Sequence, residues 1–480
     1  MRPFLDLLQA VWPYVVVVAH LGAALATSVH VLLKKSDSRA AVGWLGLVWL
    51  SPLFGSLIYL VFGINRIQRE ARTLRAGRRR ELAAPGETPG PEPLELGALE
   101  PLARAIGRTT RRPVLGGNDV TPLWDGDEAY PAMVAAIRAA EQTVSLCSYI
   151  FDDDRAGQQF VDALADAVQR GVEVRVLVDG AGVRYSPRPI DRRLRRAGVP
   201  VARFLPSLAP WRVRFVNLRN HRKVLVVDGA LAFTGGMNIR EGHAASLATP
   251  RDRIVDVHFA LRGPVVAQLQ QVFAADWAFA AGEELNGPGW FPPLRSAGEL
   301  PARAISDGPD RDFERFLDAL FGALACAERE VLVATPYFLP ERPLLRALQT
   351  AVARGVEVRI LVPARTNVVL VRWASGPAVA DAVGAGCRVY RAGAPFPHTK
   401  LVVVDRAWTL FGSANWDPRS THLNFELNVE VYGAALAEEC AARLLPAMVP
   451  EALVSADEER ARPLPVKLRD GLARLATPYL

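Results

Sequence analysis

The chain has 480 residues, 50% of them hydrophobic and 22% charged, and 57 basic against 50 acidic residues give a formal net charge of +7. This length allows two or three domains with substantial cores, and the hydrophobic share favours a membrane-associated protein. The charge alone decides nothing, because anionic lipid, nucleic acid and solubility all fit it.

Cysteine and histidine spacing argues against two classes of site. The 4 cysteines are scattered without a Cys-x-x-Cys pair, and the 7 histidines include no His-Glu-x-x-His pattern. We therefore expect no zinc site, no other metal site and no disulfide framework, and a reducing cytoplasm is the simpler setting.

Two long uncharged segments stand near the N-terminus. Residues 7–33 and 40–64 contain no Lys, Arg, Asp or Glu, and each exceeds the roughly 20 residues that cross a bilayer as a helix. We expect two transmembrane helices within residues 1–66, the first weakened by Pro13, His20 and His30. A signal peptide is the rival interpretation of the first segment, but that apolar run is too long and a second one follows at once.

Basic residues next to these segments indicate an orientation. Three lie in the short connection and seven follow the second segment: Lys34, Lys35 and Arg39, then Arg66, Arg69, Arg72, Arg75, Arg78, Arg79 and Arg80. The positive-inside rule places both ends of the pair in the cytoplasm, with the rest of the chain on that side. The arginine run either holds anionic headgroups or only stops transfer, and both readings stay open.

A basic segment and a Pro/Gly-rich linker are expected over residues 67–120, and a repeat follows them. Helix-like segments at 130–140 and 313–325 precede apolar strands at 143–150 and 330–335. Helices are then expected at 158–169 and 343–353, each ending in Arg-Gly-Val-Glu-Val-Arg. A glycine at a helix end before a strand is a βαβ-type signal. The sequence therefore predicts two α/β halves, 121–300 and 301–480, the second ending in a helix.

The first half carries an insertion around residues 185–215. Its arginines and aromatic residues fit a lipid interface or a nucleic acid, but a charge-dense helix is also a common solvated face. The residues in question are Arg184, Arg188, Arg192, Arg193, Arg195, Arg196, Arg212, Arg214, Arg219 and Arg222, with Trp211 and Phe215. The nearby Asp179-Gly-Ala-Gly182 lacks the third glycine of a dinucleotide-binding loop, and we reject that reading.

The same motif occurs once in each half. His221-Arg-Lys223-Val-Leu-Val-Val-Asp228 and His398-Thr-Lys400-Leu-Val-Val-Val-Asp405 are both His-x-Lys-x4-Asp, and each continues to Gly-x-x-Asn, at Asn238 and Asn415. One copy would fit a buried core histidine equally well. Two copies with matching tails predict one site that is shared by the two halves.

The spacing puts the reactive side chains on one face of each strand. Residues two apart in a strand point the same way, so each histidine lies beside its lysine. An ammonium neutralises phosphoryl oxygens while an imidazole attacks phosphorus or donates a proton. Asp228 and Asp405 have the opposite parity. Within the catalytic motif we expect them to orient or neutralise neighbours, and we expect Asn238 and Asn415 to lie near the phosphate.

A nucleophilic imidazole also needs its second ring nitrogen held, usually by a carboxylate. Aligning Gly263 with Gly433 pairs Asp256 with Glu426. These two carboxylates are the candidate orienting groups, and which of them serves which histidine stays open.

The paired motifs resemble those of the phospholipase D superfamily, and the chain is similar to bacterial cardiolipin synthases. Further similarities cover nearly all of it outside the linker: 335–340 (Thr-Pro-Tyr-Phe-Leu-Pro), Asp256-Val-His258, 273–277 (Phe-Ala-Ala-Asp-Trp) and the C-terminal 472–480. The resemblance implies two α/β sandwich halves packed as pseudo-twofold mates. It also implies catalysis without a metal or cofactor.

The activity that the resemblance implies is the transfer of a phosphatidyl group from one phosphatidylglycerol to another, with release of glycerol. His221 would be the nucleophile, and His398 the general acid and then the general base, although two intact motifs leave these roles exchangeable. We expect a multi-pass protein of the bacterial inner membrane whose partners are phosphatidylglycerol and the anionic bilayer, without nucleic acid. The sequence leaves the oligomeric state open.

Other functions fit the same motifs. The nearest are a hydrolytic phospholipase D and a synthase that takes phosphatidylethanolamine as donor. A membrane-tethered nuclease fits less well, since such nucleases usually carry one motif and no paired spans. A lipid-binding scaffold without activity would be expected to have lost a motif His or Lys, and all four are present.

Overall fold

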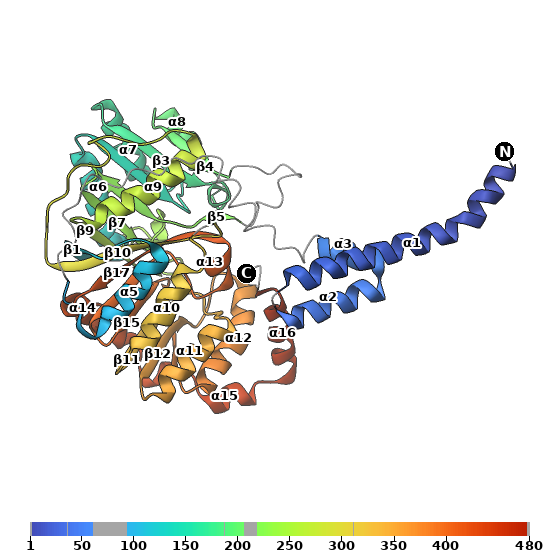
Figure 1. Ribbon diagram of the computed structural model, residues 1–480. Helices are drawn as coiled ribbons and strands as arrows, with labels where there is room; N and C mark the ends of the chain where they lie inside the picture. The colour runs from blue at the N-terminus through green and yellow to red at the C-terminus, as the bar shows by residue number, and fades with distance from the viewer. Residues whose placement is uncertain are drawn as a thin grey trace. The chain divides into compact units, whose positions relative to one another are not determined.

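The computed structural model describes residues 2–35, 37–60, 94–186, 188–205, 218–310 and 312–477 (Figure 1). The chain divides into two compact units, Met1–Glu70 and Ala71–Leu480. The arginine run after residue 64, the Pro/Gly-rich stretch up to residue 93 and the aromatic part of the insertion at 206–217 lie outside the described residues.

Within residues 2–35 and 37–60, the N-terminal unit contains three helices, α1 (Arg2–Lys34), α2 (Ser38–Leu50) and α3 (Pro52–Ile58). Within the described residues one helical stretch, Val11–Lys34 with a mean hydropathy of 2.0, is long and apolar enough to cross a membrane. The expected continuous second helix over 40–64 is interrupted, and its last four residues are not described. Ser51 adopts φ −145° and ψ 79° because a residue before proline is disfavoured from the helical region, and Pro52 starts a new helix instead.

Polar groups tie these three helices together. Trp49 Nε1 donates to Ser28 Oγ over 3.1 Å, and Ser56 Oγ donates to the Ala23 carbonyl over 3.2 Å. A Cβ at Gly55 would lie 2.5 Å from the Leu47 carbonyl oxygen, so only glycine allows this approach. Small residues and inter-helix hydrogen bonds are the usual means of packing helices in an apolar medium.

The second unit is built on one 15-stranded sheet that contains the repeat. The first half contributes the order β1-β9-β7-β6-β2-β3-β4, and the second half contributes β10-β17-β16-β15-β11-β12-β13 in the same relative places. Strands β1 and β10 pair antiparallel and join the halves (Figure 1). The bounds in the first half are β1 (Leu115–Trp124), β2 (Thr143–Ser148), β3 (Glu173–Asp179), β4 (Val201–Phe204), β6 (Val224–Val227), β7 (Leu231–Gly235) and β9 (Val257–Arg262). Those in the second are β10 (Leu300–Asp307), β11 (Glu330–Ala334), β12 (Glu357–Pro363), β13 (Arg388–Ala392), β15 (Leu401–Val404), β16 (Trp408–Gly412) and β17 (Asn424–Tyr432).

Helices cover the sheet and enclose three cores. One core runs across both halves and packs α9 (Val265–Ala281) and α14 (Ala434–Leu444) on the strands. A second lies within the first half and a third mainly within the second. The helices of these two cores are α6 (Asp125–Ala139), α7 (Arg155–Gln169) and α8 (Ile190–Arg196), then α5 (Glu100–Thr110), α10 (Arg315–Cys326), α11 (Arg342–Ala353) and α12 (Val369–Gly384). The helices and strands expected from the repeat are confirmed to within a few residues at their ends.

The linker ends earlier in the structure than the expected boundary at residue 120. Residues 100–110 form α5 and β1 begins at Leu115, so structure starts well before residue 120. Helix α5 buries Leu102 and Ile106 in the core of the second half. These apolar residues form a narrow stripe within a polar segment, so the composition of the segment alone indicated a linker. The Arg303 guanidinium fixes the helix by donating to the Ala103 carbonyl over 3.0 Å.

Two short strand pairs cross between the halves. Strand β5 (Arg219–Asn220) pairs parallel with the start of β17, and β14 (Phe396–Pro397) pairs parallel with β8 (Ile254–Val255). Strand β5 directly precedes His221, and β14 directly precedes His398. The pseudo-symmetry therefore places each motif against backbone of the opposite half.

The motif aspartates lie at the other end of the motif strands, and the neighbours that they orient are backbone groups outside the cavity wall. The Asp228 carboxylate accepts from the backbone N–H groups of residues 141, 142 and 143, at 2.8–3.0 Å. Asp405 accepts in the same way from residues 328, 329 and 330, at 2.7–2.8 Å. Each aspartate closes the turn that leads from a helix into the neighbouring strand, which is a structural role.

We predict that Asp405→Ala destabilises the protein by about 2–3 kcal/mol, because three backbone donors lose a charged acceptor. Asp405→Asn keeps one acceptor oxygen and tolerates the left-handed φ of 49° at this position, so it should cost clearly less. Thermal unfolding of the purified protein measures both changes. Equal stability of the alanine variant and the unmodified protein would contradict this role.

Candidate active site

The cross-half strand pairs position both motif histidines. The His221 N–H donates to the Phe425 carbonyl over 2.9 Å, and the His398 N–H donates to the Val255 carbonyl over 2.7 Å. Each acceptor precedes an acidic residue by one position. The backbone bond therefore brings each histidine next to the carboxylate of the other half.

The side chains complete this crossed arrangement. His221 Nδ1 lies 3.0 Å from Glu426 Oε2, and His398 Nδ1 lies 2.7 Å from Asp256 Oδ2. Both carboxylates are fully buried. A carboxylate on Nδ1 fixes the tautomer with hydrogen on that nitrogen, which leaves Nε2 with a lone pair to attack or to take a proton.

Glu426 is held more firmly than its twin. Its Oε2 accepts from Ser413 Oγ over 2.5 Å, and its Oε1 accepts from Asn424 Nδ2 over 3.0 Å. Asp256 Oδ1 accepts the N–H of Val257 over 2.8 Å. These contacts answer which carboxylate serves which histidine, a question that the alignment of the two halves left open.

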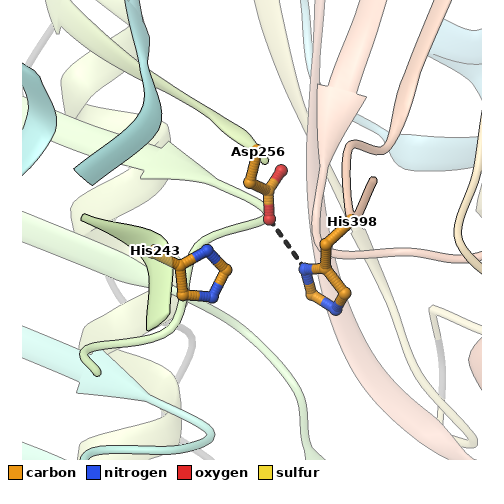
Figure 2. Close-up of side chains that lie close together, drawn as sticks. All are labelled: His243, Asp256 and His398. Carbon is orange, nitrogen blue, oxygen red and sulfur yellow. Dashed lines mark hydrogen bonds and ion pairs between the residues drawn. The ribbon is translucent and has the colours of Figure 1, made fainter. Parts of the chain in front are cut away.

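A third histidine, His243, lies against the second pair (Figure 2). One ligand atom each of His243, Asp256 and His398 lies within 4.8 Å of the others, and the rings of the two histidines stand edge to face at 5.7 Å. The trio has the composition of a metal site, but Lys400 Nζ lies 3.0 Å from His398 Nδ1, and this ammonium would repel a cation. Sequence reasoning missed His243 because it lies outside both motifs.

Both lysines lie beside their own histidine, as the strand parity predicts. Lys223 Nζ donates to the His221 carbonyl and Lys400 Nζ to the His398 carbonyl, each over 2.5 Å. Lys400 Nζ is also 3.2 Å from His398 Nε2. Two ammonium groups are thus held close to the position that a phosphoryl group in contact with the imidazoles would take.

One cavity of about 460 Å³ contains both histidines in its wall, together with Asn238 and Asn415. Asn238 Oδ1 accepts the N–H of Ile150 over 3.1 Å. Asn415 Oδ1 is buried without a hydrogen-bond partner among the described residues. Ten residues were expected at the site. The structure brings eight of them together, and the other two are the motif aspartates.

The arginines of the insertion serve several structural roles. Arg222 is buried, binds Asp276 through Nη1 at 2.6 and 2.7 Å and donates to the carbonyls of Glu426 and Asp307. It locks the two halves together and is not among the residues that line the cavity, so at Arg222 neither of the two readings left open, a lipid or nucleic-acid surface and a solvated face, applies. Arg195 and Arg203 pair with Asp191, while Arg184 and Arg219 line the cavity.

Comparison of the chain with protein families agrees with this geometry. A family model described as "Cardiolipin synthase, PLD-like domain" matches residues 133–277 and 320–445, which together exceed half of the chain, and a model described as "Phospholipase_D-nuclease N-terminal" matches residues 22–63. A protein described as "Cardiolipin synthase A" from Pseudomonas aeruginosa is 35% identical over 465 residues, which cover 94% of this chain and 93% of that protein. A "Cardiolipin synthase" from Geobacillus kaustophilus is 30% identical over 458 residues, 93% of this chain and 90% of that protein.

The chain belongs to the bacterial cardiolipin synthase family of the phospholipase D superfamily. It is a phosphatidyltransferase of the phospholipase D type, and proteins of this family are membrane-associated. A solved phosphatidylserine synthase from Haemophilus influenzae has the same fold, with a TM-score of 0.59 at 14% identity, covering 79% of this chain and all of that one.

Burial sets the protonation states that a cardiolipin synthase has to work with. It lowers the pKa of His221 to about 4, with Glu426 opposing the shift and Lys223 adding to it. Burial likewise lowers the pKa of His398 well below its ordinary value, with Lys400 and Lys223 adding to the shift. Both imidazoles are therefore neutral at pH 7 before substrate enters, and a neutral imidazole is the nucleophilic form.

The lysines and carboxylates balance one another. Burial lowers the pKa of Lys223 to about 7 and that of Lys400 to about 8, against the carboxylates that raise both. Burial also raises the pKa of Asp256, whereas His221 and Lys223 outweigh burial at Glu426 and lower its pKa. An entering phosphodiester supplies the negative charge that favours the charged form of every base around it.

We predict that Glu426→Gln lowers kcat by about a hundredfold or more, because an amide cannot stabilise the imidazolium or enforce the tautomer of His221. The measurement is phosphatidyl transfer with purified protein, with circular dichroism as the check on folding. Glu430→Gln is the matched control: it lies four residues along the same strand and pairs with Arg303, so it should cost stability without a comparable loss of kcat. Full activity of Glu426→Gln would show that the crossed contact is not used.

Proposed function

We propose that the protein makes cardiolipin from two molecules of phosphatidylglycerol through a phosphohistidine intermediate. The observation that carries this proposal is the single cavity that holds both motif histidines, each bound at Nδ1 by a carboxylate of the other half. Membership of the cardiolipin synthase family supports phosphatidylglycerol as the substrate.

In the first step His221 Nε2 attacks the phosphorus of the donor lipid. A P–N bond forms, and the P–O bond to the terminal glycerol breaks. His398, protonated once the phosphodiester anion is bound, gives its proton to the departing alkoxide, and glycerol leaves. Glu426 stabilises the positive charge that develops on the attacking ring.

In the second step the neutral His398 takes the proton from the terminal hydroxyl of the second phosphatidylglycerol. The oxygen attacks phosphorus, the P–N bond breaks, and cardiolipin forms with His221 restored. Lys223 and Lys400 neutralise the charge on the equatorial phosphoryl oxygens, and Asn238 and Asn415 add short polar groups beside them. The histidines, lysines, asparagines and the two carboxylates are thus the proposed site residues.

Hydrolysis and a phosphatidylethanolamine donor are the nearest alternatives. The histidine side chains are about one-tenth exposed, and a buried site that keeps water scarce favours an alcohol acceptor. The arginines that line the same cavity, among them Arg219 and Arg240, suit the additional phosphate that an anionic acceptor lipid brings.

Membranes containing the protein, given phosphatidylglycerol labelled in its headgroup glycerol, are expected to release labelled glycerol as cardiolipin appears. Phosphatidic acid as the main product would establish hydrolysis, and dependence on added phosphatidylethanolamine would establish the other donor. His398→Ala should abolish transfer. With a nitrophenyl leaving group, which needs no protonation, it should still accumulate a phosphorylated imidazole, mapped by mass spectrometry to His221. Label on His398 in the unmodified protein would reverse the two roles.

We further propose that residues 1–66 cross the bacterial inner membrane twice and leave the catalytic unit in the cytoplasm. The arginines that follow residue 64 support this orientation through the positive-inside rule. The break at Pro52 does not oppose a second crossing, since proline is tolerated in membrane helices whose freed backbone groups find partners.

A fluorescent-protein fusion after Arg80 should fluoresce, because that reporter matures in the cytoplasm, and an alkaline phosphatase fusion there should be inactive. An alkaline phosphatase inserted between Lys34 and Lys35 is the matched control and should be active. The reverse pattern would overturn the orientation, and equal behaviour of the two sites would leave one crossing or none.

A further inference from the structure

The C-terminal helix α16 (Leu464–Leu475) exposes a stripe of leucines. Leu464, Leu468, Leu472 and Leu475 are 60–76% exposed, and their spacing of four, four and three residues places them on one face of the helix. The same helix buries only Asp470 and Ala473. Isolated exposed leucines are ordinary, but a contiguous stripe marks an interaction surface.

The opposite face of α16 forms part of the wall behind the catalytic cavity. Ala473 packs in one cluster with Val371 of α12 and with Tyr337, and both of these residues line the cavity. Helices α12 and α16 lie side by side (Figure 1). The leucine stripe is therefore carried by a helix that packs on two residues of the cavity wall.

A second apolar patch lies at the cavity itself. Val368, Val369 and Leu370, at the start of α12, are 38–48% exposed, and Val368 lines the cavity. The exposed aromatic ring of Tyr185 lines it from the first half. Apolar and tyrosine side chains around an opening are typical of surfaces that meet the headgroup region of a bilayer.

The charges on α16 indicate which partner the stripe fits. Its charged residues are Lys467, Arg469, Asp470 and Arg474. Asp470 is buried and paired with Arg462 and Arg469, so the exposed charges on the helix are all basic. Arg474 also pairs with the exposed Asp381 of α12 over 3.2 Å, so this arginine would exchange that carboxylate for a lipid phosphate. A leucine face flanked by basic side chains is the pattern of a helix that lies in the plane of an anionic membrane surface.

We propose that α16 and the Val368–Leu370 patch form a second membrane-contact surface, separate from the N-terminal helices, which seats the cavity on an anionic bilayer. The stripe enters the headgroup region while Lys467 and Arg474 meet lipid phosphates. The lipid headgroup then reaches the histidines with its acyl chains still in the bilayer. This inference needs only a lipid substrate and does not depend on which lipid is the donor.

The depth of α16 can be measured on the full-length protein in vesicles of phosphatidylcholine with about one quarter phosphatidylserine. Leu472→Cys, in a Cys326→Ser background, carries an environment-sensitive fluorophore, and Asp166→Cys on the exposed side of α7 is the matched control. The label at 472 should shift to shorter wavelength and be quenched by lipids spin-labelled near the headgroup, and the label at 166 should not. A label at 472 that lipid does not quench, or that cross-links to a second copy, would overturn the proposal.

Activity supplies an independent test. Leu468→Ser with Leu472→Ser should lower the rate on vesicles by about tenfold or more, since the protein loses two leucine side chains that the bilayer would bury. The rate on a short-chain lipid that dissolves as monomers should stay unchanged, which shows that folding and chemistry are intact whatever donor the enzyme uses. An unchanged rate on vesicles would also overturn the proposal.

Discussion

The structure depends on one constraint: each motif imidazole belongs to one half of the repeat, and the carboxylate that holds it belongs to the other. His221 bonds to Glu426, and His398 bonds to Asp256. Both carboxylates are fully buried, and a buried carboxylate without a partner costs several kcal/mol, on the order of 3–5. Either half alone would leave its carboxylate without the imidazole that it binds, so docking of the halves and assembly of the site are one event.

The burial that this docking requires also sets the charge of the site. With both carboxylates ionised, both lysines charged and both imidazoles neutral, the six side chains carry no net charge. A phosphodiester brings one negative charge into surroundings that already lower the pKa of every base. Uptake of one proton restores the balance, and under the proposed mechanism that proton is the one that the leaving alkoxide needs.

The duplication made most of this arrangement predictable. Strand parity placed Lys223 beside His221 and Lys400 beside His398 without knowledge of the fold, because a strand has only two faces. The crossed pairing of the carboxylates was not predictable, since it arises from the parallel contacts of β5 with β17 and β14 with β8. Parity also says nothing about partners at the far end of a strand, so the backbone groups that Asp228 and Asp405 bind were not predictable from it. His243 gave no signal, being a single histidine outside any repeat, and the interruption at Pro52 could have been read from that proline.

The position of the histidines limits how a lipid can react. A cavity of about 460 Å³ lies in the range of sites for small ligands, which suits a headgroup and not a whole two-chain lipid. Under the proposed two-step mechanism, the acyl chains would therefore stay in the bilayer during both steps. A cavity that faces the solvent meets water as the abundant acceptor. A surface next to the cavity that holds it against the membrane raises the local concentration of lipid hydroxyl groups and lowers that of water, so the same two histidines favour transfer over hydrolysis.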